Sequence, residues 1–396
     1  MKKTIFKNAK IITPFRLIEF GGLAVENGKI TEVFQGEPAE VPGDWQVIDV
    51  KGNYLSPGFI DIHSHGGGNH DFMDGSVQAI LEACKTHMKY GTTTMVPTTV
   101  TSTVEELYKT LDNIKTAKKN NADTPNILGL HLEGPYISME QRGAQDPKFI
   151  KNPDRKEYLE ILSKTDDIVR WTIAPELEGA LELGVELKNR GIVASIGHSN
   201  AVYEQVLEAF EHGFTHVTHL YSGMSMVRRI KAYRYAGVVE SAFLINDMTV
   251  EIIADGKHLP ASLLKLIYNI KGADKICLVT DSMRAAGTSD TESILGSLSN
   301  GQRVIIEDDV AKTIDRASFA GSVATADRLV RTMTKIAQIP LLESVKMITY
   351  SPAKVMGIEK TKGTLAVGKD ADVIVFNDNI EVSFVMINGK IMINEI

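Results

Sequence analysis

Cysteine is scarce in this sequence, with Cys84 and Cys277 the only two among 396 residues. Folds held together by disulfide bonds need a much denser set of cysteines, and a thiolate zinc site needs several that lie close together. The count therefore argues against a disulfide framework and against a cysteine-based zinc site. It also favours a reducing compartment, where free thiols persist.

The chain also lacks an uninterrupted apolar run of membrane-spanning length. Near its start, Lys7, Asn8 and Lys10 interrupt the stretch where the apolar core of a signal peptide would lie. The net charge is -7, and the two signs are mixed along the chain, so there is no basic stripe for nucleic acid and no polybasic tail for a membrane. We expect a soluble, cytoplasmic protein whose partner is a small molecule.

From residue 59 onward, short apolar β-prone runs alternate with amphipathic, charge-rich stretches. The runs predict strands at 59–65, 93–99, 127–133, 169–175, 192–198, 216–220, 249–255 and 275–281. Helical patterns lie between them, for instance at 77–90, 104–119, 177–189, 202–212 and 261–270. Eight βα repeats favour a (β/α)8 TIM barrel over an open sheet, so the expected class is α/β.

The two ends of the chain have a different pattern of predicted secondary structure from the middle. Residues 1–56 hold short alternating strands around the turn Glu26-Asn27-Gly28-Lys29, and the C-terminal segment holds more, with Asn388-Gly389 as a hairpin signal. Because chain termini often lie close together, we expect both ends to pair into one small domain. The predicted organisation is a composite β-sandwich from residues 1–56 and 346–396 beside a catalytic barrel at 57–345.

Metal-ligand types recur where the predicted strands end. His63 and His65 lie at the end of the first strand, Glu133 ends the third, and His198 and His219 end the fifth and sixth. Taken singly, each has an ordinary explanation as a loop or rim residue. In a parallel barrel, however, the C-terminal strand ends meet at one rim, so these side chains converge. Imidazole and carboxylate suit a catalytic divalent ion with an open water position, which predicts a metal-dependent hydrolase.

Two further rim residues have candidate roles. Asp281 ends the eighth strand; it is also a suitable helix N-cap, but beside a metal-activated water it can accept a proton and pass it to a leaving amine. His258 follows the seventh strand and is either a substrate-orienting group or a plain loop histidine. His131 lies on the side of Glu133 and is expected to hydrogen-bond a ligand, while His87 on a predicted helix is expected at the surface.

A cationic loop follows the sixth strand. It runs from Ser222 to Gly237 and carries Arg228, Arg229, Lys231 and Arg234. Such runs are usually solvated surface loops. At the active rim of a barrel, however, guanidinium groups suit an anion such as phosphate, which they bind in a bidentate manner.

Several motifs resemble the N-acetylglucosamine-6-phosphate deacetylase family of the amidohydrolase superfamily over nearly the whole chain. They are His131-Leu-Glu-Gly-Pro135, Gly197-His198-Ser199, Thr218-His219-Leu-Tyr-Ser-Gly-Met-Ser225, Ala254-Asp-Gly256 with His258, Thr280-Asp-Ser-Met283, Phe319-Ala-Gly-Ser322 and a closing segment from Gly363. The glutamate-bearing motif is specific, because many other superfamily members use a carboxylated lysine there.

The resemblance implies a ligand set and a mechanism. Glu133, His198 and His219 would hold the principal ion, and His63 with His65 could hold a second. Zn²⁺ or Fe²⁺ would be expected, one or two per subunit. Asp281 would be the general base and then the general acid in the removal of an acetyl group.

The resemblance also implies substrate contacts by Gln145, Ser222, Gly223, Arg234, His258 and Ala320. Ser222-Gly223 replaces the Asn-Ala that is usual in the family, and Gln145 stands where many members have a histidine. Arg234 best matches an arginine that reaches the phosphate site of the neighbouring subunit, which implies a homodimer.

Other functions stay open at this point. The nearest is the same reaction on N-acetylgalactosamine 6-phosphate or another N-acyl sugar phosphate. A cyclic-amide hydrolase or deaminase is disfavoured by the missing carboxylated-lysine motif and by the cationic loop. A catalytically silent barrel that binds sugar phosphates is disfavoured because it would have no need of Asp281 beside five metal ligands.

Overall fold

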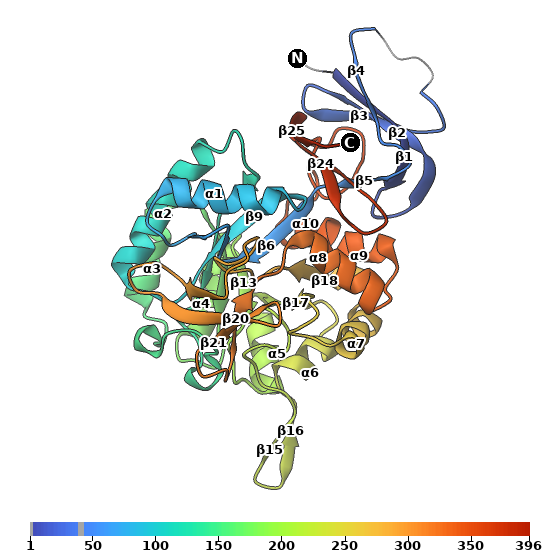
Figure 1. Ribbon diagram of the computed structural model, residues 1–396. Helices are drawn as coiled ribbons and strands as arrows, with labels where there is room; N and C mark the ends of the chain where they lie inside the picture. The colour runs from blue at the N-terminus through green and yellow to red at the C-terminus, as the bar shows by residue number, and fades with distance from the viewer. Residues whose placement is uncertain (1–2, 39–42) are drawn as a thin grey trace.

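The computed structural model describes residues 3–38 and 43–396, and it shows a barrel beside a sheet that is built from both ends of the chain (Figure 1). Within these residues, no helix is long and apolar enough to span a membrane.

Eight strand positions form a closed parallel barrel in the described part of the chain. The ring closes between its first and last strands, because the Asp281 N–H donates to the His63 carbonyl oxygen at 2.9 Å and Ser64 bridges Ser282. The strands are β6 (Phe59–Ser64), β9 (Thr92–Thr99), β10 (Asn126–Ile127) with β11 (Leu130–Glu133), β12 (Ile168–Ile173), β13 (Val193–Ile196), β14 (Phe214–Val217), β17 (Thr249–Ile253) and β18 (Ile276–Val279). The predicted (β/α)8 fold is confirmed.

Helices cover the outside of the barrel (Figure 1). They are α1 (Val77–Met88), α2 (Val104–Lys119), α3 (Arg155–Lys164), α4 (Ala180–Asn189), α5 (Tyr203–Glu211), α6 (Val238–Leu244), α7 (Ala261–Lys271), α8 (Ala326–Arg331), α9 (Leu341–Ile348) and α10 (Tyr350–Val355). The start of α2 follows local capping chemistry: the Thr103 side chain accepts the Glu106 N–H, and the sequence predicts a helix over the same residues.

Alternate residues of each barrel strand face opposite sides. In β17, Val250 and Ile252 pack in the large cluster beneath the helices, whereas Ile253 packs in a smaller cluster with Ile60 and Cys277. This smaller cluster fills the barrel interior, so the strand pleat directs Glu251, which lies between Val250 and Ile252, inward as well. The interior is packed and carries the site at one end.

The terminal segments form one mixed sheet, as the sequence predicts. Its strands are β1 (Lys3–Ile12), β2 (Leu17–Glu26), β3 (Lys29–Gln35), β4 (Gln46–Asp49), β5 (Tyr54–Pro57), β23 (Val373–Phe376), β24 (Val382–Ile387) and β25 (Lys390–Asn394). β23 pairs with β5 and joins the two ends. The sheet folds over its own core. The ring centroids of Phe6 in β1 and Phe384 in β24 lie 5.3 Å apart, although two strands separate β1 from β24 in the sheet. The boundaries at residues 56 and 346 stay predictions.

Among the elements that the sequence analysis did not predict are an antiparallel sheet and a hairpin. The first is an antiparallel sheet between β18 and α8, formed by β19 (Glu292–Leu295), β20 (Gln302–Glu307), β21 (Val310–Thr313) and β22 (Phe319–Ser322). Its last strand is held to the barrel by a bridge between Ser322 and Ser282. The second is a hairpin of β15 (Arg228–Ile230) and β16 (Tyr233–Tyr235), which projects away from the barrel at the bottom of Figure 1.

Candidate metal centre and active site

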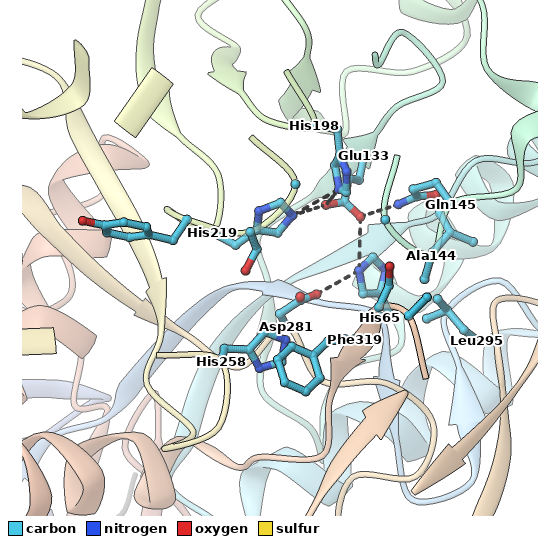
Figure 2. Close-up of a pocket in the computed structure, with 18 residues that line it drawn as sticks. His65, Glu133, Ala144, Gln145, His198, His219, His258, Asp281, Leu295 and Phe319 are labelled. Atoms are coloured by element: carbon cyan, nitrogen blue, oxygen red, sulfur yellow. Dashed lines mark hydrogen bonds and ion pairs between the residues drawn. The ribbon is translucent and has the colours of Figure 1, made fainter. Parts of the chain in front are cut away.

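A pocket of about 330 Å³ opens where the barrel strands end, a size in the range of small-molecule sites. Most of the residues predicted for the site line it: His65, Glu133, Gln145, His198, His219, Ser222, Gly223, His258 and Asp281 (Figure 2). Leu295 and Phe319, from the antiparallel sheet that follows β18, close one wall. That sheet therefore contributes to the site.

Glu133 lies at the centre of the predicted ligands. Its Oε1 atom lies 2.9 Å from His219 Nε2 and 3.2 Å from His198 Nε2, and its Oε2 atom lies 3.4 Å from His65 Nε2 (Figure 2). His63 Nε2 is 3.6 Å from Oε1. Glu133 is thus shared by two groups that can hold an ion: His63, His65 and Glu133, and Glu133, His198 and His219.

The outer nitrogens of two histidines fix which ring nitrogen faces the pocket. His198 Nδ1 lies 2.8 Å from the Gln141 carbonyl oxygen, which can only accept, so Nδ1 carries the proton. His63 Nδ1 likewise donates to the Glu251 carboxylate at 3.1 Å. In the neutral rings, both Nε2 atoms then direct lone pairs into the site. This is the orientation that metal-binding histidines need.

The residues present fit a divalent metal. Among the described residues, His63 Nε2 and Asp281 Oδ1 are buried atoms without a hydrogen-bond partner. His198 Nε2 and His219 Nε2 lie 3.2 Å apart, close to the separation of about 3.3 Å expected for two nitrogens bound at about 2.0–2.1 Å to one tetrahedral ion. Nitrogen and carboxylate donors without thiolates suit zinc, iron, manganese or cobalt.

Two carboxyl groups of the site are held in the charged form. Burial alone would raise the pKa of Glu133, but the neighbouring imidazoles, first that of His63 and then those of His198 and His219, hold it well below its ordinary value. Burial likewise opposes the charge on Asp281, while His63 and His65 lower its pKa. Asp281 Oδ1 lies 3.1 Å from His65 Nε2 and 3.3 Å from His63 Nε2. A proton acceptor therefore lies directly beside the ligand cluster.

Two polar residues on the pocket wall are oriented by neighbours. His258 Nδ1 lies 2.8 Å from Asp255 Oδ2, and its ring centroid is 4.5 Å from that of Phe319. Gln145 Oε1 accepts the Thr101 N–H at 2.8 Å, so its amide NH₂ group must be the one that lies 2.7 Å from Glu133 Oε2. Gln145 thus holds a candidate ligand as well as lining the pocket.

Gly223 lies against a candidate ligand. It has a φ of +55°, and a Cβ atom placed there would lie 2.8 Å from His198 Nδ1 and 2.9 Å from the Gln141 carbonyl oxygen. Glycine therefore permits the hydrogen bond that fixes the His198 ring.

Two of the predicted substrate residues lie elsewhere. The Ala320 side chain is fully buried in an apolar cluster with Met283 and Leu295, and its neighbours Phe319 and Gly321 line the pocket instead. Arg234 lies on the projecting hairpin, exposed to solvent, with its guanidinium 3.2 Å from the Ala232 carbonyl oxygen. The roles of both residues stay predictions.

The environments of two other histidines differ from the prediction. His87 was expected at the surface but is fully buried, with its Nε2 2.9 Å from the Gly66 carbonyl oxygen and 3.1 Å from Ser282 Oγ. His131 packs edge-on against the His63 ring and hydrogen-bonds Thr98 and Thr172 instead of a ligand. His131 thus packs against a candidate ligand, and His87 joins the segments that follow His65 and Asp281.

The sequence analysis missed a buried ion pair below the ligands, formed by Arg170 of β12 and Glu251 of β17. Both side chains have no exposed surface. Burial opposes the charge on Glu251, but Arg170 and then His63 hold its pKa well below the ordinary value. A charged residue inside an otherwise apolar strand was the available signal, in Ile-Val-Arg-Trp-Thr-Ile and in Thr-Val-Glu-Ile-Ile.

The geometry agrees with similarities to known proteins. An N-acetylglucosamine-6-phosphate deacetylase of Lysinibacillus sphaericus is 32% identical over 98% of this chain and 97% of its own. An N-acetylgalactosamine-6-phosphate deacetylase of a Shewanella species is 30% identical over 98% and 95%. The crystal structure of an N-acetylglucosamine-6-phosphate deacetylase from Pasteurella multocida matches with a TM-score of 0.91 and 30% identity, covering 99% of this chain and 100% of that one. The sequence pattern of the amidohydrolase family matches residues 54–392, and the chain belongs to this family.

Proposed function

We propose that this protein is a metal-dependent hydrolase that removes the N-acetyl group from N-acetylglucosamine 6-phosphate, giving glucosamine 6-phosphate and acetate. The observation that carries the proposal is the position of Asp281, a buried carboxylate that lies against the nitrogen and oxygen ligand cluster in one pocket. According to their names, the relatives described above act on amino sugar 6-phosphates, which supports this substrate class.

Glu133, His198 and His219 would hold the principal ion, and His63 with His65 would hold a second one through the shared Glu133. Zn²⁺ and Fe²⁺ suit this donor set, with one or two ions per subunit. When bound, a divalent ion supplies Lewis-acid activation of water and of the acetyl carbonyl.

Asp281 moves the proton in the proposed reaction. Because His63 and His65 keep it ionised, it can accept a proton from the attacking water as the oxygen bonds to the acetyl carbon. Asp281 then returns this proton to the nitrogen as the C–N bond breaks, so that the sugar leaves as a neutral amine. One carboxylate thus acts first as base and then as acid.

The pocket wall would orient the sugar phosphate. His258, held by Asp255, and the Ser222-Gly223 segment present donors to the sugar and its phosphate, and Phe319 offers an aromatic face. Contacts from Gln145 and from the Ala320 backbone are part of the same proposal.

The counter-charge for the phosphate would come from a second subunit. Within the described residues, neither lysine nor arginine lines the pocket. Arg234 lies on a hairpin that extends away from its own barrel (Figure 1). We therefore propose a homodimer in which this arginine enters the pocket of its neighbour. The reaction would take place in the cytoplasm, in keeping with the two buried free thiols.

Acetate release tests the proposed reaction. The metal-reconstituted enzyme is assayed with N-acetylglucosamine 6-phosphate, its galactosamine epimer and unphosphorylated N-acetylglucosamine. We expect the first substrate to give the highest kcat/KM. A preference for the galactosamine epimer would reassign the sugar, and silence on all three would refute the deacetylase.

Mixed dimers test the role of Arg234. An Arg234→Ala subunit and an Asp281→Asn subunit are each defective alone, through KM and kcat respectively. In a hybrid, an arginine acting across the interface leaves one intact site, so low-KM activity returns on mixing. If the arginine serves its own pocket, mixing restores nothing.

A further inference from the structure

The Arg170–Glu251 pair contacts both halves of the candidate metal site from below. We propose that it is a positioning device, which fixes the rings and backbone of the histidine ligands and thereby sets the affinity for metal. This inference rests on the proposed ligand set.

One carboxylate oxygen of Glu251 serves two ligand strands. Its Oε2 atom accepts the His63 ring Nδ1–H at 3.1 Å and the His219 backbone N–H at 3.0 Å. His63 belongs to the group with His65, and His219 to the group with His198. A single oxygen atom therefore constrains one ligand from each group.

Arg170 fixes Glu251 and the residues that precede the ligands. Its guanidinium pairs with Glu251 Oε1 and also donates to the Ile62 carbonyl oxygen at 3.2 Å and to Thr218 Oγ1 at 2.8 Å. Ile62 directly precedes His63, and Thr218 directly precedes His219. Arg170 Nε further donates to Ser195 Oγ, in the strand that leads to His198, at 3.1 Å.

Stability alone does not account for this pair. Barrel interiors are filled mostly by branched apolar side chains, and the cluster around Ile60 and Val279 continues that pattern. Replacing a buried ion pair with apolar residues of similar volume is often neutral or stabilising, because both charges lose their hydration on burial. What apolar residues cannot supply is an acceptor for the His63 ring and the His219 backbone. Orientation of the ligands is thus the property that needs the charges.

Two variants separate positioning from structural support. The double variant Arg170→Met/Glu251→Leu removes both charges together and leaves no uncompensated buried charge, so its melting temperature in the metal-free state should fall less than that of a variant that removes one charge alone. The single variant Glu251→Gln keeps the shape and an acceptor oxygen but leaves Arg170 without its counter-charge, so it should melt lower. Between the two variants, metal affinity should follow the opposite order, with the double variant binding metal more weakly than the single one. We expect the dissociation constant for Co²⁺ or Zn²⁺ to rise about 10–100-fold in the double variant and less in the single one.

Co²⁺ titration of the metal-free proteins, followed by visible absorption, measures both affinity and ligand geometry. A matched control is Lys362→Met/Asp372→Leu, which removes a partly buried ion pair near the terminal sheet and should leave Co²⁺ binding unchanged. Wild-type affinity and spectrum in the Arg170→Met/Glu251→Leu protein would overturn the inference while leaving the proposed function intact. A wild-type protein that binds no Co²⁺ or Zn²⁺ would instead refute the ligand set itself.

Discussion

Replacing Asp281 with asparagine tests the chemistry most directly, because the change removes an ionisable group and little else. Asparagine has the same shape and tolerates the positive φ of 45° at this position. The backbone bonds from the Asp281 N–H to the His63 carbonyl oxygen and from the Ser322 N–H to the Asp281 carbonyl oxygen involve no side chain and should persist. We therefore expect Asp281→Asn to fold and to bind metal and substrate.

The expected loss of turnover follows from the two roles of one carboxylate. Positioned acid–base groups contribute about 10²–10⁴-fold each. Asp281 is only 6% exposed, so bulk water is poorly placed to replace it. We expect kcat to fall about 10³-fold or more, which corresponds to about 4 kcal/mol of transition-state stabilisation. Because the lost interaction belongs to the transition state, KM should change little.

The assay is steady-state acetate release together with metal content by mass spectrometry. Retention of kcat within about 10-fold of wild type, at equal metal content, would refute the assigned base. The next candidate for the base would be His258, because it lines the same pocket and its ring is oriented by Asp255. Loss of metal together with turnover would instead assign Asp281 a ligand role.

Three further predictions concern the surroundings of the site. Gln145→Glu places a second carboxyl group beside Glu133. The activity of this variant relative to wild type should fall as pH rises, because the two carboxyl groups repel each other once both are ionised; the pH–rate profile measures this. Gly223→Ala forces a Cβ atom against His198 Nδ1 and should lower kcat/KM roughly 10²-fold, with Gly223→Ser affected at least as much. Metal-free protein should lose thermal stability as pH falls below about 4.5, because the unfolded chain takes up a proton on Glu251 that the folded chain resists; unchanged melting between pH 6 and 3.5 would contradict this.

The sequence predicts the barrel well because its strands are buried on both faces. Such strands form short continuous apolar runs, and ligands at their ends must converge at one rim. The antiparallel sheet after β18 gave no such signal. In β20 only Val304 is buried, and the small core shared with Leu295 and Ala311 leaves a weak alternation. A locally paired sheet with one thin core face is hard to recognise without its partner strands.

The positions of the candidate ligands were predictable, but what holds them was not. Glu251 and Arg170 lie 81 residues apart, and only the closed barrel brings them together. Their charges inside apolar strands were visible, yet nothing in the spacing linked them to His63 or His219. The pocket that Arg234 would enter is harder still to predict, because in the proposed homodimer it belongs to a second chain.

The backbone at the site shows why so much support is concentrated there. His198, His219 and Asp281 all have positive φ values, of 48°, 27° and 45°. Residues other than glycine are uncommon in this region, and each such position typically costs about 1–3 kcal/mol. These conformations persist only when surrounding bonds determine them. For His219, one such bond runs from its own N–H to Glu251, and another runs from the Ser222 N–H to its carbonyl oxygen. The buried carboxylate thus opposes backbone strain at one ligand while it orients the ring of another, and removing it should loosen both together.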